Sequence, residues 1–261
     1  MNYSEKILTS IDIVVISVSN EESDNQRKNS KKMMSILLEK RNKEPFKDRW
    51  GLPGGLLEPN DTLVDSAKKV LKKASNISNI YIEQLYTFDN LERDPRGRVI
   101  STSYVALIDK NRLKEKINNN VSWFNIINIE DKDNIVNIVL NNGKETLKFS
   151  IRKKLREKTT DRYEFYVHKN ECLAFDHPII ILSALERIKS KSNYTDIVFN
   201  MMPKYFTLGE LQQVYEVILG KQLLKSVFRR VIASKVKKTN KMKTDKAHRP
   251  SSLYTYNDNK S

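Results

Sequence analysis

Residues 54–76, GGLLEPNDTLVDSAKKVLKKASN, carry side chains of two opposite chemical kinds. A pair of glycines leads to two carboxylates, Glu58 and Asp61, and hard divalent cations need several such ligands at once. Later in the segment, lysines that include Lys69 and Lys73 stand where further carboxylates would have to approach the same cation. Because an ammonium group repels a metal ion, the two carboxylates alone predict weak metal binding at most.

Three arginines flank a proline turn in the sequence RDPRGR, and they are the strongest candidates for holding a small anion. Arg93, Arg96 and Arg98 could bind phosphate through paired N–H donors. The alternative is a charged hairpin loop in which Asp94 pairs locally. Glu83, near a predicted strand end, could accept a hydrogen bond from a ribose or a base, or could be an exposed strand charge.

Two other reactive residue types have plain structural explanations. Cys172 is the single cysteine and lies beside Leu173 and Ala174, so a packing role is favoured and no intrachain disulfide is possible. This cysteine usage fits a reducing cytoplasm. His177 precedes Pro178 as the first residue of a predicted helix, and the sequence gives no reason to make it a catalytic base.

The net charge of +15 is concentrated at the C-terminal end. Residues 220–261 hold 12 lysines and arginines against two aspartates, and so carry +10 of that total. Such an excess favours a polyanionic partner, usually DNA or RNA. The alternative is a solvated basic tail.

Composition bounds the remaining possibilities. The chain has 261 residues, enough for about two domains. No apolar run approaches the roughly 20 residues that a membrane span requires, so a cytoplasmic protein without a membrane partner is expected. The N-terminal residues, MNYSEKILTS, show no signal-peptide pattern.

The N-terminal part alternates strand patterns with one clear helix. A capping box at Thr62 and Asp65 predicts a helix that continues to Ala74. Apolar and β-branched runs predict strands at residues 11–18, 35–38, 80–88, 99–108, 135–140, 146–151 and 163–167. Mixed strands with an intervening helix predict an α/β or α+β domain.

The C-terminal part is helical and then ends in a ribbon. Asp176 is a predicted N-cap for a helix to about residue 189, and a capping box at Thr207 and Glu210 predicts a helix that ends at Gly220. A second helix is predicted at residues 226–232, with Val227, Phe228, Val231 and Ile232 on one face and Lys225, Arg229, Arg230 and Ala233 on the other. A lysine-rich hairpin and a strand at 249–256 follow, which is the order of a winged helix-turn-helix.

The second of these helices presents basic side chains that could reach DNA. Such a helix needs an apolar face for anchorage and polar side chains for phosphates or guanine edges. The candidate DNA contacts are Lys225, Arg229, Arg230, Lys235, Lys238 and Arg249. The alternative is an arginine pair that simply faces solvent. Tyr254 and Tyr256 are expected to pack the wing.

Residues 55–76 resemble a Nudix box, whose pattern is Gly-x5-Glu-x7-Arg-Glu-x2-Glu-Glu-x-Gly. Gly55 is kept and Asp61 replaces the first glutamate, but the later acidic pairs are Lys69-Val70 and Lys73-Ala74, and the final glycine is Asn76. The resemblance implies a domain whose metal-binding acids have been lost. We therefore expect no catalytic residues, no metal and no cofactor, and the alternative is that the motif survives as scaffold only.

Most of the chain also resembles the Nudix-related transcriptional regulators of the NrtR type. The matching segments are 81–88, 93–101, 173–177, 206–208 and 228–230. This resemblance implies an α+β protein, with a Nudix-like α/β/α sandwich and mixed sheet followed by a C-terminal winged helix-turn-helix. The corresponding ranges are an effector-sensing domain at 1–172, a connecting helix at 173–200 and a DNA-binding domain at 201–261.

The function that the resemblance implies is a homodimeric, ligand-responsive repressor that binds a palindromic operator in double-stranded DNA. Its effector would be ADP-ribose or a related nucleotide of NAD metabolism, with Arg93, Arg96, Arg98, Glu83 and Glu58 as ligand contacts. Three alternatives stay open. They are a regulator of the same architecture that responds to a sugar such as arabinose, a Nudix hydrolase acting on ADP-ribose, and an RNA-binding or protein-interaction module.

Overall fold

A computed structural model describes residues 6–20, 32–75, 80–110, 120–159, 162–244 and 250–258. The chain divides into two compact units. The first unit comprises residues 1–16, 35–107 and 113–186, and the second comprises 17–34, 108–112 and 187–261. Among the described residues, no helix has the length and apolar character needed to cross a bilayer.

The first unit is built on a mixed β-sheet. Its strands are β1 (Leu8–Asn20), β2 (Lys32–Lys40), β3 (Trp50–Gly51), β4 (Gly54–Leu56), β5 (Tyr81–Phe88), β6 (Val99–Leu107), β7 (Val121–Lys132), β8 (Ile135–Asn141), β9 (Thr146–Glu157) and β10 (Arg162–Asn170). The order is β10-β9-β8-β7-β2-β1-β6-β5, with β3 beside β2 and β4 beside β1. β1 and β6 run parallel, whereas β2 and β7 are antiparallel.

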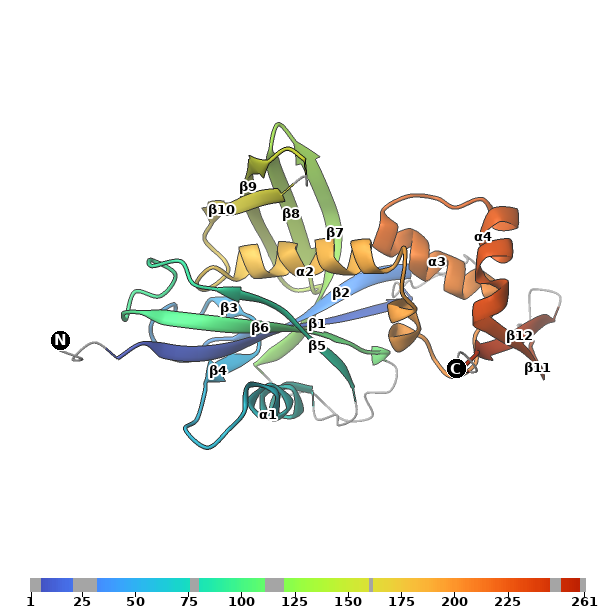
Figure 1. Cartoon of the computed structure of the whole chain (residues 1–261), viewed down its shortest axis with the longest axis horizontal. Helices are drawn as coiled ribbons and strands as arrows, with labels where there is room; N and C mark the ends of the chain where they lie inside the picture. Colours follow the sequence, from blue (N-terminus) through green and yellow to red (C-terminus); the bar gives the residue numbers. More distant parts are fainter. Residues whose placement is uncertain are drawn as a thin grey trace. The chain divides into compact units, whose positions relative to one another are not determined.

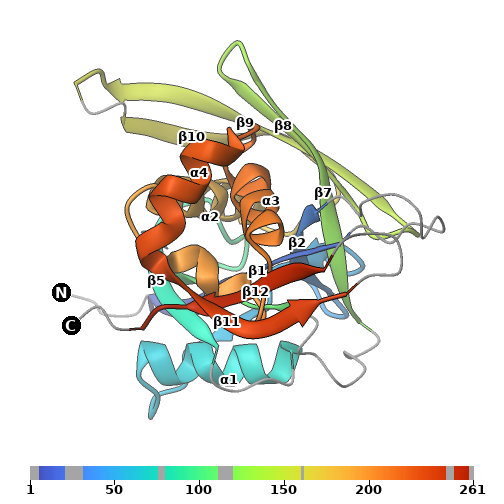
Figure 2. The same ribbon diagram turned by 90° about the vertical axis from the view of Figure 1, so that its right-hand side faces the viewer.

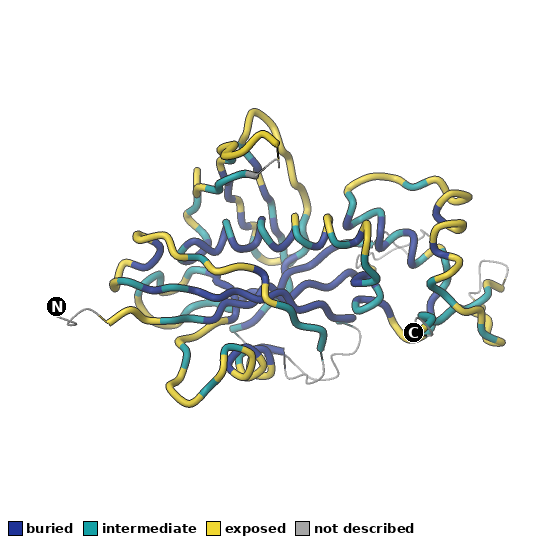
Figure 3. The backbone as a smooth tube through the Cα atoms, viewed as in Figure 1, coloured by how far each residue is buried: buried dark blue, intermediate teal, exposed yellow. Residues whose placement is uncertain are grey.

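Two helices cover opposite faces of this sheet, as Figure 1 shows for α1 (Leu63–Ser75) and α2 (His177–Lys191). Strand β1 is buried without interruption from residue 11 to residue 19, because both faces of a central strand are covered. Figure 3 shows this central part of the sheet in dark blue. The α/β/α sandwich with a mixed sheet is therefore confirmed.

Local sequence signals account for most of these elements. The backbone N–H of Asp65 donates to the hydroxyl of Thr62 at 3.1 Å, so the predicted helix start is confirmed. Strand β7 is missing from the prediction, although Ile127 and Ile129 in its second half alternate with polar residues; both isoleucines are about half exposed, at 53% and 46%. It pairs with β2 and β8 and completes the sheet.

The second unit contains the winged helix. Its elements are η2 (Ile197–Met201), α3 (Leu208–Leu219), α4 (Lys225–Ile232), η3 (Ala233–Lys235), β11 (Val236–Lys243) and β12 (Ser251–Tyr256). Thr207 and Glu210 form the predicted capping box, and Gly220 ends α3 in the left-handed conformation with φ 67°. Figure 2 shows the hairpin of β11 and β12 beside α3 and α4, which confirms the winged helix-turn-helix.

The faces of α4 differ from the predicted ones. Phe228 and Ile232 are buried as expected, and Phe228 packs edge-on against Tyr215 of α3 with ring centroids 5.5 Å apart. Val227 and Val231 are instead 43% and 60% exposed, so the prediction of one four-residue apolar face is wrong. A helix of two turns that contacts its unit along one narrow line buries only positions four residues apart.

Candidate functional site

The first unit contains a buried cluster of charged side chains. Arg93 donates to both carboxylate oxygens of Asp176, at 3.0 Å from Nε and 2.8 Å from Nη2. The same Nη2 lies 3.4 Å from Oδ2 of Asp12, which also accepts a 2.5 Å hydrogen bond from Ser101. This bidentate pairing fixes the guanidinium in the plane of the Asp176 carboxylate.

The surroundings of this cluster keep its groups charged. Burial would raise the pKa of Asp12, but the hydrogen bond from His177, together with Ser101 and Arg93, holds that pKa below its ordinary value. Burial would likewise lower the pKa of Arg93, but Asp176 and then Asp12 keep it raised. Removal of the arginine would leave buried carboxylates without a cation, and removal of the carboxylates would leave a buried cation without an anion.

His177 joins this cluster to the glycine-containing turn at residues 51–55. Its Nδ1 accepts a 2.9 Å hydrogen bond from the backbone N–H of Leu52, and its Nε2 lies 3.5 Å from Oδ1 of Asp12. A nitrogen that accepts cannot carry the proton, so the neutral ring has its proton on Nε2, toward Asp12. The packing there is tight, because a Cβ on Gly54 would lie 2.6 Å from the carbonyl oxygen of Ile11.

Phe175 forms an aromatic wall beside His177, with ring centroids 5.4 Å apart, and two arginines lie over its ring. The guanidinium carbons of Arg41 and Arg96 lie 4.7 and 5.7 Å from the centroid of its ring. Phe46 packs edge-on against the same ring at 4.9 Å. Phe175 has a φ of 49°, a conformation that is costly for an aromatic residue and is common at functional sites.

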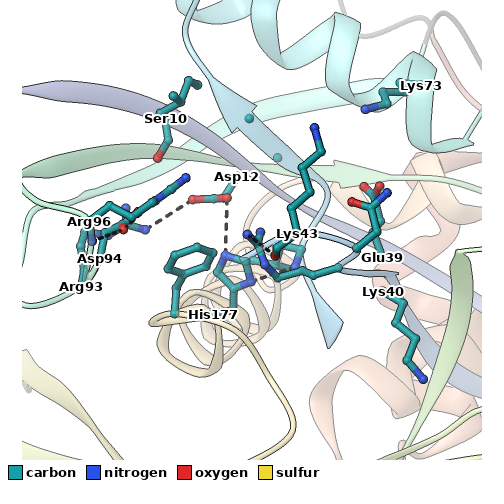
Figure 4. A pocket seen from close by; sticks show the side chains of 17 residues that line it. Ser10, Asp12, Glu39, Lys40, Lys43, Lys73, Arg93, Asp94, Arg96 and His177 are labelled. Atoms are coloured by element: carbon teal, nitrogen blue, oxygen red, sulfur yellow. Dashed lines mark hydrogen bonds and ion pairs between the residues drawn. The ribbon is translucent and has the colours of Figure 1, made fainter. Parts of the chain in front are cut away.

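These groups surround a pocket of about 230 Å³, shown in Figure 4. Six cationic and three acidic side chains line it, namely Lys40, Arg41, Lys43, Lys73, Arg93 and Arg96 against Asp12, Glu39 and Asp94. Burial and then the nearby charge of Arg96 lower the pKa of Arg41. A pocket with excess positive charge and an aromatic wall is suited to an anionic ligand that carries a flat ring.

The sequence-predicted ligand residues fall in three places. Arg93 and Arg96 line the pocket, Arg93 as part of the buried cluster and Arg96 in an ion pair of 2.7 Å with Asp94. Glu58 lines a second cavity beside it. Arg98 instead donates to the carbonyl oxygen of Asp89, and Glu83 accepts a hydrogen bond from Tyr81. The pocket linings include neither Arg98 nor Glu83.

Several pocket residues are missing from the sequence prediction. Asp12 is hidden within an apolar strand, and Arg41 and Lys43 follow β2 in a segment with no motif. Phe175 and His177 lie in the family segment 173–177, but the sequence does not mark either residue as a ligand contact. An aspartate inside a fully buried strand was the one available signal for Asp12, because a charge there requires a partner.

The predicted DNA contacts in the second unit differ in exposure. Lys225, Arg229 and Arg230 are exposed on α4, and Lys238 is exposed on β11. Lys235 instead forms a 2.7 Å ion pair with Asp196 and is mostly buried. Arg249 lies outside the described residues.

Tyr256 packs within the wing unit, as predicted, whereas Tyr254 contributes through its backbone. The hydroxyl of Tyr256 donates to Asp196 at 2.9 Å, and its ring packs on Phe199 with centroids 4.5 Å apart. The backbone of Tyr254 exchanges two hydrogen bonds with Phe206, which closes the wing onto the segment before α3. Exposed basic side chains on α4 and β11 therefore lie on elements that these contacts hold in place.

Comparison with known proteins agrees with this geometry. Residues 198–256 match the family model described as the NrtR DNA-binding winged helix domain. Over 228 residues, the chain is 30% identical to the ADPR responsive transcriptional repressor NtrR of Acinetobacter baylyi, covering 85% of this chain and 76% of that protein. The chain belongs to the NrtR family. As a member of the NrtR family, it is a ligand-responsive, DNA-binding transcriptional repressor with a Nudix-like sensor domain.

Two solved structures extend the likeness to the whole chain. The crystal structure of NrtR from Shewanella oneidensis complexed with a 27mer DNA is 26% identical with a TM-score of 0.68, covering 95% of this chain and 93% of that chain. A MutT/nudix family protein from Enterococcus faecalis is also 26% identical with a TM-score of 0.71, covering 98% of this chain and 89% of that chain. The NrtR fold therefore accounts for both units.

Proposed function

We propose that the sensor pocket binds ADP-ribose or a related nucleotide of NAD metabolism, and that the bound ligand weakens the affinity of this repressor for its operator. The relative from Acinetobacter baylyi is named as responsive to ADPR, and that name supports the proposal. ADP-ribose carries two linked phosphates and a flat adenine ring. It therefore has the two chemical features that the pocket is suited to recognise.

The observation that carries the proposal is the pair of arginines on one aromatic ring. The guanidinium groups of Arg41 and Arg96 both lie over the ring of Phe175. Their mutual repulsion contributes to the lowered pKa of Arg41. A diphosphate placed between them would remove that repulsion and accept several charge-assisted hydrogen bonds. Phe175 would then stack on the base or pack against a ribose.

The proposal includes the absence of pyrophosphate hydrolysis. Hydrolysis of a diphosphate in this fold needs a metal held by several carboxylates on α1, whereas α1 presents Lys69, Val70 and Lys73. Asp61, which stands at the first acidic position of the motif, is paired with Lys69 at 2.7 Å. The ligand would dissociate from the pocket without being hydrolysed, as an effector does.

We also assign a homodimer in the cytoplasm, where the operator DNA is. Two α4 helices related by a two-fold axis would match the two halves of a palindromic operator. The ligand needs only to bind one dimer geometry more tightly than the other in order to change the DNA affinity.

Isothermal titration calorimetry of the full-length protein with ADP-ribose tests the effector assignment. We expect Arg96→Ala to weaken binding about tenfold, since it removes a charged donor from the pocket. Arg98→Ala is the comparison, because Arg98 lies on the same loop and donates to the carbonyl oxygen of Asp89. Arabinose and NAD are titrated in parallel.

Two results would contradict the assignment. Equal losses in the two arginine variants would mean that the pocket around Phe175 is not the ligand site. Tight binding of arabinose without binding of ADP-ribose would replace the nucleotide by a sugar. A second assay, release of AMP from ADP-ribose with magnesium or manganese, separates the regulator from a hydrolase.

A further inference from the structure

A second cavity of about 200 Å³ adjoins the effector pocket along α1. The two cavities share Glu39, Gly54, Gly55, Leu56 and Lys73 among their lining residues. The remaining walls of the second cavity are Glu58, Asp61, Ser66, Lys69 and Val70. Lys73 therefore stands at the junction, and a ligand in the first pocket can extend past it.

The carboxylate of Asp61 in this cavity is already neutralised. Nζ of Lys69 donates to both of its oxygens, at 2.7 and 2.8 Å. The hydrogen bond to Asp61 is the main reason that the pKa of Lys69 is raised. An ammonium group thus occupies the position beside Asp61 that a metal ion would need.

The other residues of the cavity do not fit a divalent cation. A magnesium or manganese site needs several oxygen ligands around one point. The described part of the chain contains no group of three His, Cys, Asp or Glu side chains that could hold a metal. On α1, the three positions that the Nudix pattern gives to acids are Val70, Lys73 and Ala74, and Ala74 is buried.

Lysines approach the junction from two elements. Lys73 comes from α1, and Lys43 comes from the segment after β2 and enters the same pocket, as Figure 4 shows. Arg41 and Arg96 lie at Phe175 in that pocket. Cations from separate elements thus surround the space that a diphosphate would fill beside the aromatic wall.

We propose that Lys73, aided by Lys43, binds the diphosphate of the effector in place of a divalent metal, so that effector binding is independent of metal. This inference rests on the proposed function, and it names the cationic residue of α1 that contacts the effector. A fixed ammonium group supplies positive charge to phosphate oxygens without needing the acidic ligands that a metal requires. It also leaves no metal-bound water to attack the diphosphate.

Calorimetry on the full-length protein tests the inference, with ADP-ribose titrated once in chelator and once in excess magnesium. We expect the two affinities to agree within about twofold, and Lys73→Ala to lose about tenfold in both buffers. Lys72→Ala is the matched control, because Lys72 is an exposed neighbour on α1 that lines neither cavity. Lys72→Ala should bind as the wild type does, and thermal unfolding checks that both variants are folded.

The outcomes separate this inference from the proposed function. Binding that requires magnesium, or a Lys73→Ala variant that matches Lys72→Ala, would overturn the lysine assignment while ADP-ribose remained the effector. If ADP-ribose does not bind in either buffer, the effector assignment fails, and inorganic pyrophosphate becomes the probe. Pyrophosphate binding in chelator that Lys73→Ala weakens would support the lysine site, and no binding of pyrophosphate would overturn it.

Discussion

The buried cluster around Arg93 and helix α4 both contain arginine, yet they hold its charge in opposite ways. In the pocket, Arg93 is 7% exposed and is held by two carboxylates, so its charge is balanced within the protein. On α4, Arg229 and Arg230 are exposed. Buried, paired charge fixes the shape of a site, whereas exposed charge is available to a polyanion. The same residue type thus supports structure in one unit, and in the other it is exposed where the predicted DNA contacts lie.

Of the substitutions considered, replacement of Arg93 should reduce stability most. Arg93→Ala leaves Asp176 and Asp12 buried without their cation, and we expect a loss of about 3–5 kcal/mol in the free energy of unfolding. Arg229→Ala, the matched change on α4, should alter that free energy by less than about 0.5 kcal/mol. Chemical denaturation measures both. Similar losses in the two variants would contradict the contrast.

A pair of glycine variants tests how tightly the pocket floor is packed. A Cβ on Gly54 would collide with the carbonyl oxygen of Ile11 and the carboxylate of Asp12, whereas a Cβ on Gly55 would meet nothing within 4 Å. We expect Gly54→Ala to cost about 1–3 kcal/mol and to weaken effector binding, because it displaces Asp12. Gly55→Ala should be tolerated. If Gly55→Ala were the more damaging of the two, the assigned packing of this turn would be wrong.

Removing the exposed arginines of α4 should affect DNA binding and leave stability unchanged. For the double variant Arg229→Ala, Arg230→Ala, we expect operator affinity to fall by at least about tenfold and the slope of log affinity against log salt to decrease by about 2. Lys235→Ala provides the contrast, since Lys235 is paired with Asp196 and should chiefly affect packing. Fluorescence anisotropy at several salt concentrations measures each variant. If the double variant lost stability but kept its DNA affinity, the two arginines would have a structural role and no role in DNA binding.

Acid should weaken the sensor unit through Asp12, and this is the smallest of the expected effects. The pKa of Asp12 is lower in the folded protein than its ordinary value, so its stabilising contribution is present above about pH 4 and is lost as the pH falls through the folded pKa. Asp12→Asn should be less stable than wild type near pH 6 and should lose less on acidification. Unfolding measured between pH 6 and pH 3 checks this, and parallel curves for the two proteins would contradict it.

The sequence predicts what depends on local pattern and fails where distant residues meet. The capping box at Thr207 and the left-handed Gly220 follow from spacing within α3, and the exposed arginines follow from spacing within α4. The pairing of Arg93 with Asp176 joins residues 83 positions apart, and no local signal indicates it. Val231 shows the limit within a helix, because periodicity marks an apolar face without saying how much of it the unit covers.

The pocket illustrates the same limit from the functional side. The arginine-rich loop at residues 93–98 attracts notice in the sequence, but only Arg93 and Arg96 among its arginines line the cavity. The aromatic wall and its second guanidinium come from two other connections, at Phe175 and Arg41. Chemistry that is assembled from several loops becomes visible only once the fold brings those loops together.

The most direct test of the central claim is fluorescence anisotropy of the full-length protein on a labelled duplex from its own upstream region, titrated with ADP-ribose. We predict tight binding that is selective over scrambled DNA, and a loss of affinity of about tenfold or more when ADP-ribose saturates the pocket. Arabinose should leave the affinity unchanged. Equal binding to the duplex and to scrambled DNA, or an operator affinity that ADP-ribose does not change, would contradict the claim that this protein is an ADP-ribose-responsive repressor.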